Sequence, residues 1–161
     1  MNNKGMTLIE IVIYIGILST VVFLISNLVV MTTRLVLNVS ANSSLNNDLN
    51  YISARLRYDL GRATSISNPS TTGISTNDLS LTINNETYTF DGASGASFTL
   101  TEPSGTYQLN SKETTVVSNF TLIGDPGDAK TIKIDLTLTS LNQIPAGNKT
   151  LSSTLYYALH F

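Results

Sequence analysis

A single carboxylate stands at the entrance to the longest apolar stretch of this sequence. Glu10 directly precedes Ile11 to Met31, a run that carries no charge. The interruptions of this run are mild, namely Gly16, Ser19, Thr20, Ser26 and Asn27. An ionisable residue at the mouth of a membrane helix predicts a function, because an unpaired carboxylate there is costly. The chemistry it offers is electrostatic, since a carboxylate in low dielectric is strongly favoured beside a positive group.

The apolar run itself predicts a membrane-spanning helix. A stretch of about 20 such residues is long enough to cross a bilayer. On its own, the run is also compatible with a plain single-span anchor or an uncleaved signal-anchor. Glu10 on its own would stabilise the helix N-terminus through the macrodipole, and Gly5 on its own would be a flexible residue near a free terminus.

No other group of residues forms a catalytic or metal-binding pattern. His160 is the only histidine, and one ligand does not make a metal site. Asp125, Asp128 and Asp135 match no calcium-loop spacing and are expected to be solvated acids around a Pro-Gly turn. The absence of cysteine excludes disulfide scaffolds, thiol catalysis and cysteine–zinc sites. We therefore predict no metal, no cofactor and no enzymatic activity.

Composition narrows the class of protein further. The length of 161 residues suits one compact domain plus an anchor. Charged residues make up 12%, well below the usual share of about 25%. The net charge of −2 gives no basic footprint for nucleic acid.

The chain is expected to have four parts. Residues 1–5 form a short polar leader, and Lys4 is its one charge. Residues 6–33 form the transmembrane half of a long helix, and residues 34–63 form its amphipathic half. Residues 64–161 form a globular β-sheet domain rich in Ser, Thr, Gly and Asn.

The amphipathic half is predicted from apolar residues at spacings of four and three, which lie on one helix face. These residues are Leu45, Leu49, Ile52, Leu56 and Leu60. The helix would run from Thr7 to Ala63, and Gly61 is expected to mark its end. We do not expect strict continuity, because Asn and Ser crowd the stretch Asn38 to Asn50 and compete for backbone hydrogen bonds.

Beyond Pro69 the apolar residues alternate, which predicts β-strands. The clearest strands are Leu79–Ile83, a partner with Tyr88 and Phe90 after an Asn84-Asn85 turn, Ile132–Leu138 and Leu155–Phe161, with weaker ones near Phe98–Leu100, Tyr107–Leu109 and Val116–Leu122. An antiparallel sheet with one apolar face would cover the apolar stripe of the helix. The predicted fold class is α+β, with a long N-terminal helix packed on a C-terminal antiparallel sheet domain.

The segment Gly5-Met6-Thr7-Leu8-Ile9-Glu10, followed at once by the apolar run, resembles the N-terminus of the type IV pilin and type II secretion pseudopilin family. The resemblance covers about the first 35 residues and implies a pilin-like fold. It implies that a prepilin peptidase cuts between Gly5 and Met6 and that Met6 is then N-methylated. Glu10 becomes the fifth mature residue and neutralises the new amine of an adjacent subunit. The family more often has phenylalanine at the position of Met6, and many of its major pilins have a C-terminal disulfide that this chain lacks.

A second, looser resemblance concerns the end of the helix. The stretch Leu49 to Ala63, whose basic end from Arg55 to Ala63 contains Asp59 four residues after Arg55 and three before Arg62, is similar to the J-type minor pseudopilins. Asp59 is placed to pair with both arginines along the helix surface. This resemblance implies a minor subunit.

Together the resemblances imply a structural subunit of a pilus, a type II secretion pseudopilus or a DNA-uptake filament, helping to initiate or cap assembly. Its partners would be other pilin or pseudopilin subunits, the prepilin peptidase, the inner-membrane assembly platform and, before assembly, the lipid bilayer. Nucleic acid would be a partner only in a DNA-uptake filament. The chain would cross the cytoplasmic membrane once, with its C-terminal domain outside the cytoplasm, and then join an extracellular or periplasmic filament. The alternative is a single-span anchored extracytoplasmic binding domain that joins no filament.

Overall fold

The computed structural model describes residues 7–92, 95, 97–124, 131–141 and 147–159. The chain divides into two compact units, residues 1–39 and residues 40–161. One α-helix comes first and nine β-strands follow it among the described residues. All described strand pairs are antiparallel. The predicted α+β class, a long apolar N-terminal helix with a C-terminal antiparallel sheet domain, is therefore confirmed at this level.

Helix α1 (Leu8–Leu60) is continuous over 53 residues. The expectation of a break in the Asn- and Ser-rich stretch is wrong. Asn38 and Asn46 turn their side-chain amides back onto the helix and donate to the carbonyls four residues earlier, at 2.9 and 2.8 Å. These side chains therefore leave the main-chain ladder intact. Gly61 follows the last helical residue as predicted, and its N–H donates to the carbonyl of Arg57 at 3.0 Å.

In the second unit, α1 buries the predicted apolar stripe. Leu45, Ile52, Leu56 and Leu60 are at most 7% exposed, whereas Leu49 is only partly buried. These side chains belong to one core cluster with residues from both sheets described below. This burial stabilises the helix through the stretch where its local propensity is weak.

A five-stranded sheet has the order β1-β3-β4-β5-β6. Its strands are β1 (Ser65–Asn68), β3 (Asp78–Ile83), β4 (Glu86–Asp91), β5 (Thr99–Glu102) and β6 (Gly105–Gln108). The predicted Asn84-Asn85 turn joins β3 to β4, and both residues have positive φ, at 53° and 66°. Positive φ at both central positions defines the type I′ turn that suits a two-residue hairpin.

A four-stranded sheet has the order β2-β7-β8-β9. Its strands are β2 (Ser75–Thr76), β7 (Thr114–Ile123), β8 (Thr131–Ser140) and β9 (Thr150–Ala158). The predicted alternation is clearest in β8, where Ile132, Ile134, Leu136 and Leu138 are all 0% exposed. Of the predicted final strand, His160 and Phe161 lie outside the described residues.

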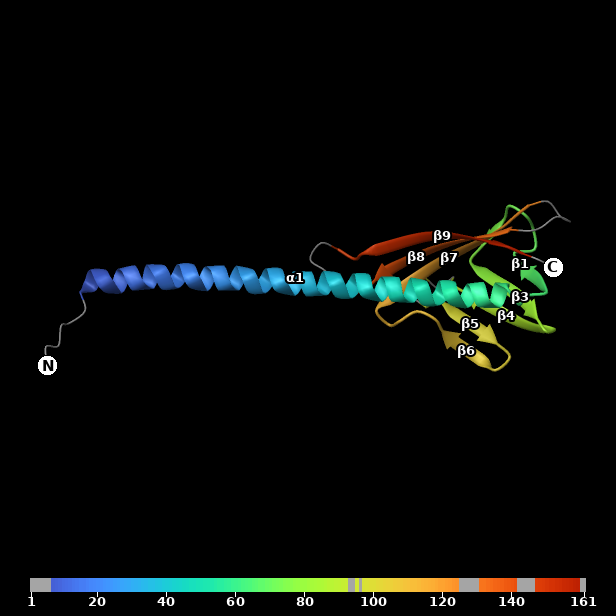
Figure 1. Cartoon of the computed structure of the whole chain (residues 1–161), viewed down its shortest axis with the longest axis horizontal. Coiled ribbons are helices and arrows are strands. Elements are labelled where there is room, and N and C mark those ends of the chain that lie inside the picture. The colour runs from blue at the N-terminus through green and yellow to red at the C-terminus, as the bar shows by residue number, and fades with distance from the viewer. Residues whose placement is uncertain (1–6, 93–94, 96, 125–130, 142–146, 160–161) are drawn as a thin grey trace. The chain divides into compact units, whose positions relative to one another are not determined.

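The expectation of a single sheet is wrong, because the described strands form two sheets and the chain passes between them more than once, for example at Asn77. This residue separates β2 from β3, and the Ser118 hydroxyl of β7 donates to its carbonyl at 2.9 Å. Phe90, Phe98 and Phe120 stack in sequence across the junction, with ring centroids 6.2 and 6.5 Å apart. The two sheets therefore share one core, and within the second unit α1 lies against both of them (Figure 1).

Asp59 does not lie on the helix surface as predicted but is fully buried. Arg55 does pair with it, with Nε 2.7 Å from the carboxylate, and Arg55 also reaches Glu102 of β5 at 3.0 Å. Arg62 is more distant, at 4.0 Å. A buried carboxylate is tolerated when it is paired. The ion pair thus joins α1 to the β5–β6 hairpin.

Asp48 forms a second polar attachment of the helix, one that the sequence analysis missed. Its carboxylate accepts hydrogen bonds from the main-chain N–H and the hydroxyl of Ser111, at 3.0 and 2.8 Å, and from the hydroxyl of Thr114. Buried Asn110 accepts from the N–H of Phe98 at 2.7 Å. The segment between β6 and β7 is therefore fixed to both α1 and the core.

Truncating the centre of the buried stripe tests this packing. We expect Ile52→Ala to lower the free energy of unfolding of the second unit by about 2–5 kcal/mol, because it leaves a cavity in a shared core. The measurement is urea unfolding of the full chain in detergent micelles, followed by tyrosine fluorescence. Asn47→Ala on the exposed helix face is the matched control and should change the free energy by less than about 0.5 kcal/mol. Equal effects of the two substitutions would contradict the packing.

Candidate functional site

Thr7 and Glu10 form a reciprocal capping box at the start of α1. The Glu10 carboxylate accepts hydrogen bonds from the Thr7 main-chain N–H at 3.1 Å and from the Thr7 hydroxyl at 3.2 Å. The Glu10 N–H in turn donates to the Thr7 hydroxyl oxygen at 3.4 Å. This arrangement satisfies N–H groups that the first helical turn leaves without partners. The carboxylate also lies at the positive end of the helix dipole.

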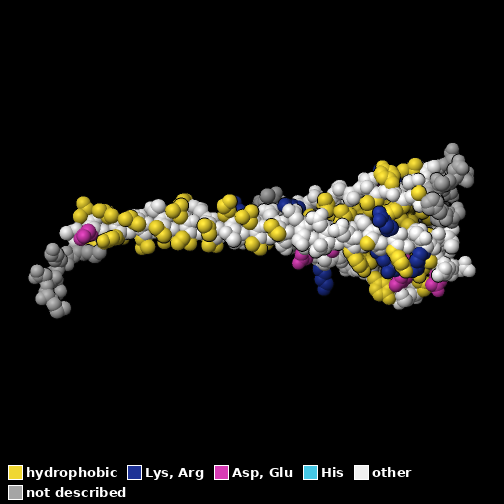
Figure 2. Space-filling model, in the orientation of Figure 1, with side chains coloured by type: hydrophobic (Ala, Val, Ile, Leu, Met, Phe, Trp, Pro, Cys, Tyr) yellow, Lys and Arg dark blue, Asp and Glu magenta, His cyan; other side chains and the backbone are white. Residues whose placement is uncertain are grey.

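The helix that follows is uncharged and uncovered. Residues 11–33 contain no Asp, Glu, Lys or Arg, and every side chain from Thr7 to Val36 is exposed. The uncharged stretch is about 35 Å long as a helix, against about 30 Å for a bilayer core. Hydrophobic side chains follow the visible face of this unit along its length (Figure 2). Among the described residues, α1 is the one helix long and apolar enough to cross a membrane.

The serine and threonine hydroxyls of the apolar stretch are satisfied within the helix. Each donates to the main-chain carbonyl four residues earlier at 2.7–3.0 Å, as seen for Ser19, Thr20, Ser26, Thr32 and Thr33. In lipid, polar groups must find partners inside the protein, because no water is present. This pattern therefore lowers the cost of placing five hydroxyls in a bilayer.

Asn27 differs from these hydroxyls. Its side-chain amide makes no hydrogen bond within the described part of the chain. A Cβ added at Gly16 would meet no atom within 4 Å, so this glycine leaves a gap in the helix surface. Small residues and amides are the features through which membrane helices pack and hydrogen-bond to one another. Both positions are accessible to another helix.

Of the predicted site residues, the structure describes Glu10 but not Gly5 or Met6. Glu10 is placed beside Thr7, and no positive side chain of the described residues lies within ion-pair distance of it. Gly5 and Met6, the predicted cleavage site, lie outside the described residues, so the cut stays a prediction. The T-x-x-E spacing alone could have revealed the capping box, which the sequence analysis missed.

The metal and catalytic candidates remain largely unplaced. His160, Asp125 and Asp128 lie outside the described residues. Asp135 is described, and its carboxylate is 2.7 Å from Lys133 Nζ and accepts from the Thr154 hydroxyl at 2.6 Å. Within the described ranges, no group of three or more His, Cys, Asp or Glu side chains is placed to hold a metal ion.

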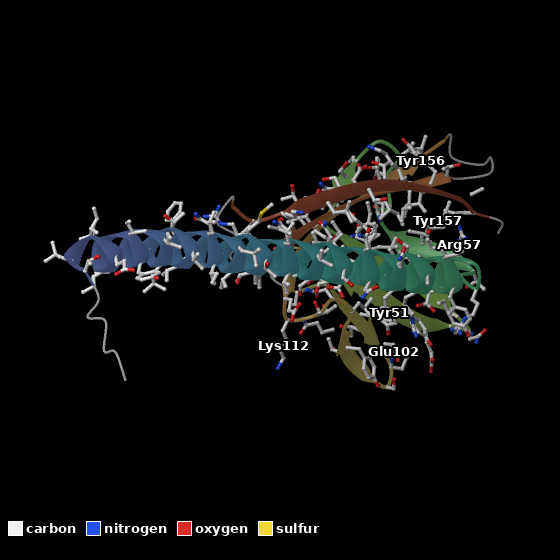
Figure 3. All side chains as sticks on the ribbon, turned by 60° about the vertical axis from the view of Figure 1, so that its left-hand side comes forward. Tyr51, Arg57, Glu102, Lys112, Tyr156 and Tyr157 are labelled. Atoms are coloured by element: carbon white, nitrogen blue, oxygen red, sulfur yellow. The ribbon has the colours of Figure 1, made fainter. Side chains whose placement is uncertain are left out.

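Two surface grooves border α1 in the second unit, and sequence reasoning found neither. One has a volume of about 500 Å³ and is lined by Ser53, Ala54, Arg57, Tyr58, Leu155 and Tyr157. The other has about 380 Å³ and lies between Tyr51 and Arg55 of α1 and the β5–β6 hairpin. Figure 3 shows Arg57 and Tyr157 on one side of the helix and Tyr51 and Glu102 on the other. Both grooves arise from residues far apart in sequence, so no local motif indicates them.

Comparison with known proteins adds no relative. No family model, no curated protein and no solved structure matches this chain. Its function is therefore inferred from its own residues and their geometry.

A charge placed in the middle of the apolar stretch tests the membrane span. We expect Val22→Arg to make insertion less favourable by about 3 kcal/mol, because arginine is costly at the centre of a bilayer. The measurement is the inserted fraction of this helix in a glycosylation-reporter assay. Val22→Ala is the matched control and should insert nearly as well as the natural sequence. A low inserted fraction for the natural sequence, unchanged in the arginine variant, would show that the stretch does not cross lipid.

Proposed function

We propose that this chain is a minor pilin or pseudopilin, a non-enzymatic structural subunit of a type IV pilus-like filament. The observation that carries the proposal is the exposed Glu10 carboxylate in the first turn of α1, directly ahead of the uncharged, uncovered helix. The filament would be a pilus, a type II secretion pseudopilus or a DNA-uptake filament. The Gly5-Met6 pair ahead of the helix supports processing by a prepilin peptidase.

Before assembly, the capping box stabilises the Glu10 carboxylate at the lipid boundary. A free carboxylate at the lipid boundary is costly, and the Thr7 N–H together with the helix dipole lowers that cost. Cleavage between Gly5 and Met6 would create a positive amine. In the filament, the amine of an adjacent subunit replaces or joins the Thr7 N–H as donor to the same carboxylate. A charged donor makes a stronger hydrogen bond than a neutral one, so the exchange favours assembly.

The rest of the chain fits the same role. Before assembly the apolar stretch would hold the subunit in the cytoplasmic membrane as a single span, with the sheet domain outside the cytoplasm. The assembly platform of the inner membrane would then transfer it to a periplasmic or extracellular filament. There Gly16 and Asn27 would contact the helices of other subunits.

Glu10 also bears on the place of the subunit in the filament. A carboxylate that neutralises the amine of a neighbour is useful only where another subunit lies above. We therefore place this subunit below at least one other, within a small complex that initiates or caps the filament.

The first test is the N-terminus of the mature protein. We expect the intact mass and the N-terminal fragment mass from native membranes to fit a chain that starts at Met6 and carries one added methyl group. A chain that starts at Met1, in cells whose other pilins are processed, would remove the main support for the proposal. The anchored extracytoplasmic binding domain would then be the better explanation.

The second test separates the charge of Glu10 from its capping role. Glu10→Gln keeps an N3 side chain that can serve the capping box but removes the charge. We expect it to lower incorporation into sheared filaments at least about tenfold, as Glu10→Ala should, because breaking a buried charge pair costs about 3–5 kcal/mol. Thr7→Ala is the matched control. It keeps the carboxylate, costs about 1 kcal/mol of helix capping and should still be incorporated.

The comparison is made at equal membrane levels of correctly processed protein, measured by immunoblot. Normal incorporation of Glu10→Gln, or an equal loss in Thr7→Ala, would show that Glu10 acts as a helix cap and not as a charge partner.

A further inference from the structure

β9 is a long edge strand without the usual protection against pairing. It stands at one end of the order β2-β7-β8-β9, and β8 is its only strand neighbour among the described residues. Its nine residues contain no charge and no proline, and its register with β8 is unbroken. Proteins normally guard an exposed edge with a short strand, a charge, a proline or a bulge. β9 has none of these features.

The other sheet edges are protected. β2 has two residues, and β6 has four. β1 has four residues, contains a register shift between Ile66 and Asn68, and is followed by Pro69. Among the described edge strands, β9 is therefore the longest and the least protected by these features.

The inner face of β9 is also incompletely covered. Leu151, Leu155 and Tyr157 point toward the core but are only partly buried, whereas the corresponding residues of β8 are fully buried. On the outer face, Tyr156 is 61% exposed. A further strand beside β9 would cover these apolar side chains and pair the open main-chain groups of the edge.

The 500 Å³ groove lies directly beside this edge. Leu155 and Tyr157 of β9 form one wall, and α1 forms the other. The hydroxyl of Tyr157 donates to the main-chain carbonyl of Ser53 at 3.4 Å, which holds the walls together at one end. Ala54 is the smallest side chain of the helix wall and leaves room there for an apolar side chain. The volume falls in the range of about 300–1,000 Å³ that is typical of binding pockets.

Arg57 sets the charge of the groove. Of the three arginines near the end of α1, Arg55 and Arg62 lie within 4.0 Å of the Asp59 carboxylate. The Arg57 guanidinium instead lies over the Tyr157 ring at 5.9 Å and has no carboxylate partner among the described residues. An arginine held on an aromatic ring at the rim of an apolar groove is a ready partner for a carboxylate. Arginine and tyrosine are also the residues that most often dominate binding energy at interfaces.

We propose that the β9 edge and this groove bind an extended, acidic segment of another polypeptide. The segment adds a strand to β9, places an apolar side chain between α1 and β9, and sets a carboxylate against Arg57. Figure 3 shows Arg57 beside Tyr157. A second copy pairing through its own β9 does not fit, because β9 has no acidic residue to offer Arg57. None of these observations depends on the proposed filament.

The test uses the full chain in detergent micelles, isotope-labelled for NMR. The probes are blocked peptides of alternating valine and threonine, each with one aspartate, and the aspartate occupies a different position in each peptide of the set. We expect at least one peptide to shift the β9 amide signals and to slow their hydrogen exchange. Replacing its aspartate with asparagine should weaken binding about twofold to fivefold, as expected for a partly exposed ion pair. Methylating alternate main-chain nitrogens of the peptide should abolish binding, because it removes the donors that pair with β9.

Two protein variants complete the test. Arg57→Gln should weaken binding of the aspartate peptide by the same factor as the asparagine replacement does. The two changes together should weaken binding no further than either change alone. Lys112→Gln, an exposed cation outside the groove lining, should leave binding unchanged. The proposal is overturned if no peptide protects the β9 amides, if the methylated peptide binds equally well, or if Arg57→Gln has no effect. Concentration-dependent protection of β9 without peptide would also overturn it, because a second copy would then be the occupant.

Discussion

The buried face of α1 between Ala41 and Leu60 is the contact on which the folded domain depends. The apolar residues of this face share one core with inward-facing residues of both sheets. Without the helix, the inward-facing side chains of the sheets would be exposed to water. β8 alone contributes four fully buried aliphatic side chains to the shared core. Asp48 and Asp59 interrupt this face. Asp48 is compensated by the Ser111 segment, and Asp59 is paired with Arg55 of the same helix, which in turn contacts Glu102 of β5. These contacts specify the position of the helix, because a shifted helix would leave the buried Asp48 carboxylate without Ser111 and would separate Arg55 from Glu102.

One continuous helix thus meets two different surroundings. In the first unit the side chains are apolar on all faces and no part of the described chain covers them, which is the pattern of a lipid-facing helix. In the second unit only one stripe is apolar and the opposite face carries Asn, Tyr and Arg. Arg34 is the first charge after Glu10 and stands close to the change from one pattern to the other. The helix requires no break at this boundary, because its main-chain hydrogen bonds are internal in both surroundings.

Local patterns predicted the elements, and non-local pairing decided their arrangement. The helix end at Gly61, the Asn84-Asn85 turn and the alternation in β8 each depend on residues within a few positions of one another, so the sequence was sufficient. The division into two sheets depends on which strands pair, since β7 pairs with β2 and β8 rather than with β6, and no local signal indicates that choice. The burial of Asp59 depends on a non-local contact, in which β5 brings Glu102 to Arg55, and local spacing does not indicate such a contact. The position of Glu10 ahead of the apolar run predicted it as a site residue, whereas its hydrogen bonds with Thr7 follow from a different signal, the T-x-x-E capping spacing.

The two proposed contacts would contribute different things to an assembly. A carboxylate at Glu10 recognises an amine, and every chain cut at such a site presents one, so this contact sets the stagger between subunits without identifying the neighbour. Selecting one neighbour requires a surface whose shape and charge few chains can match. An open edge strand alone is also unselective, because main-chain hydrogen bonds accept any extended segment. The Arg57–Tyr157 groove adds the missing restriction, since it admits only segments that carry an apolar side chain and an acid at the correct spacing. In this arrangement the helix provides attachment, and the sheet domain provides the choice of partner.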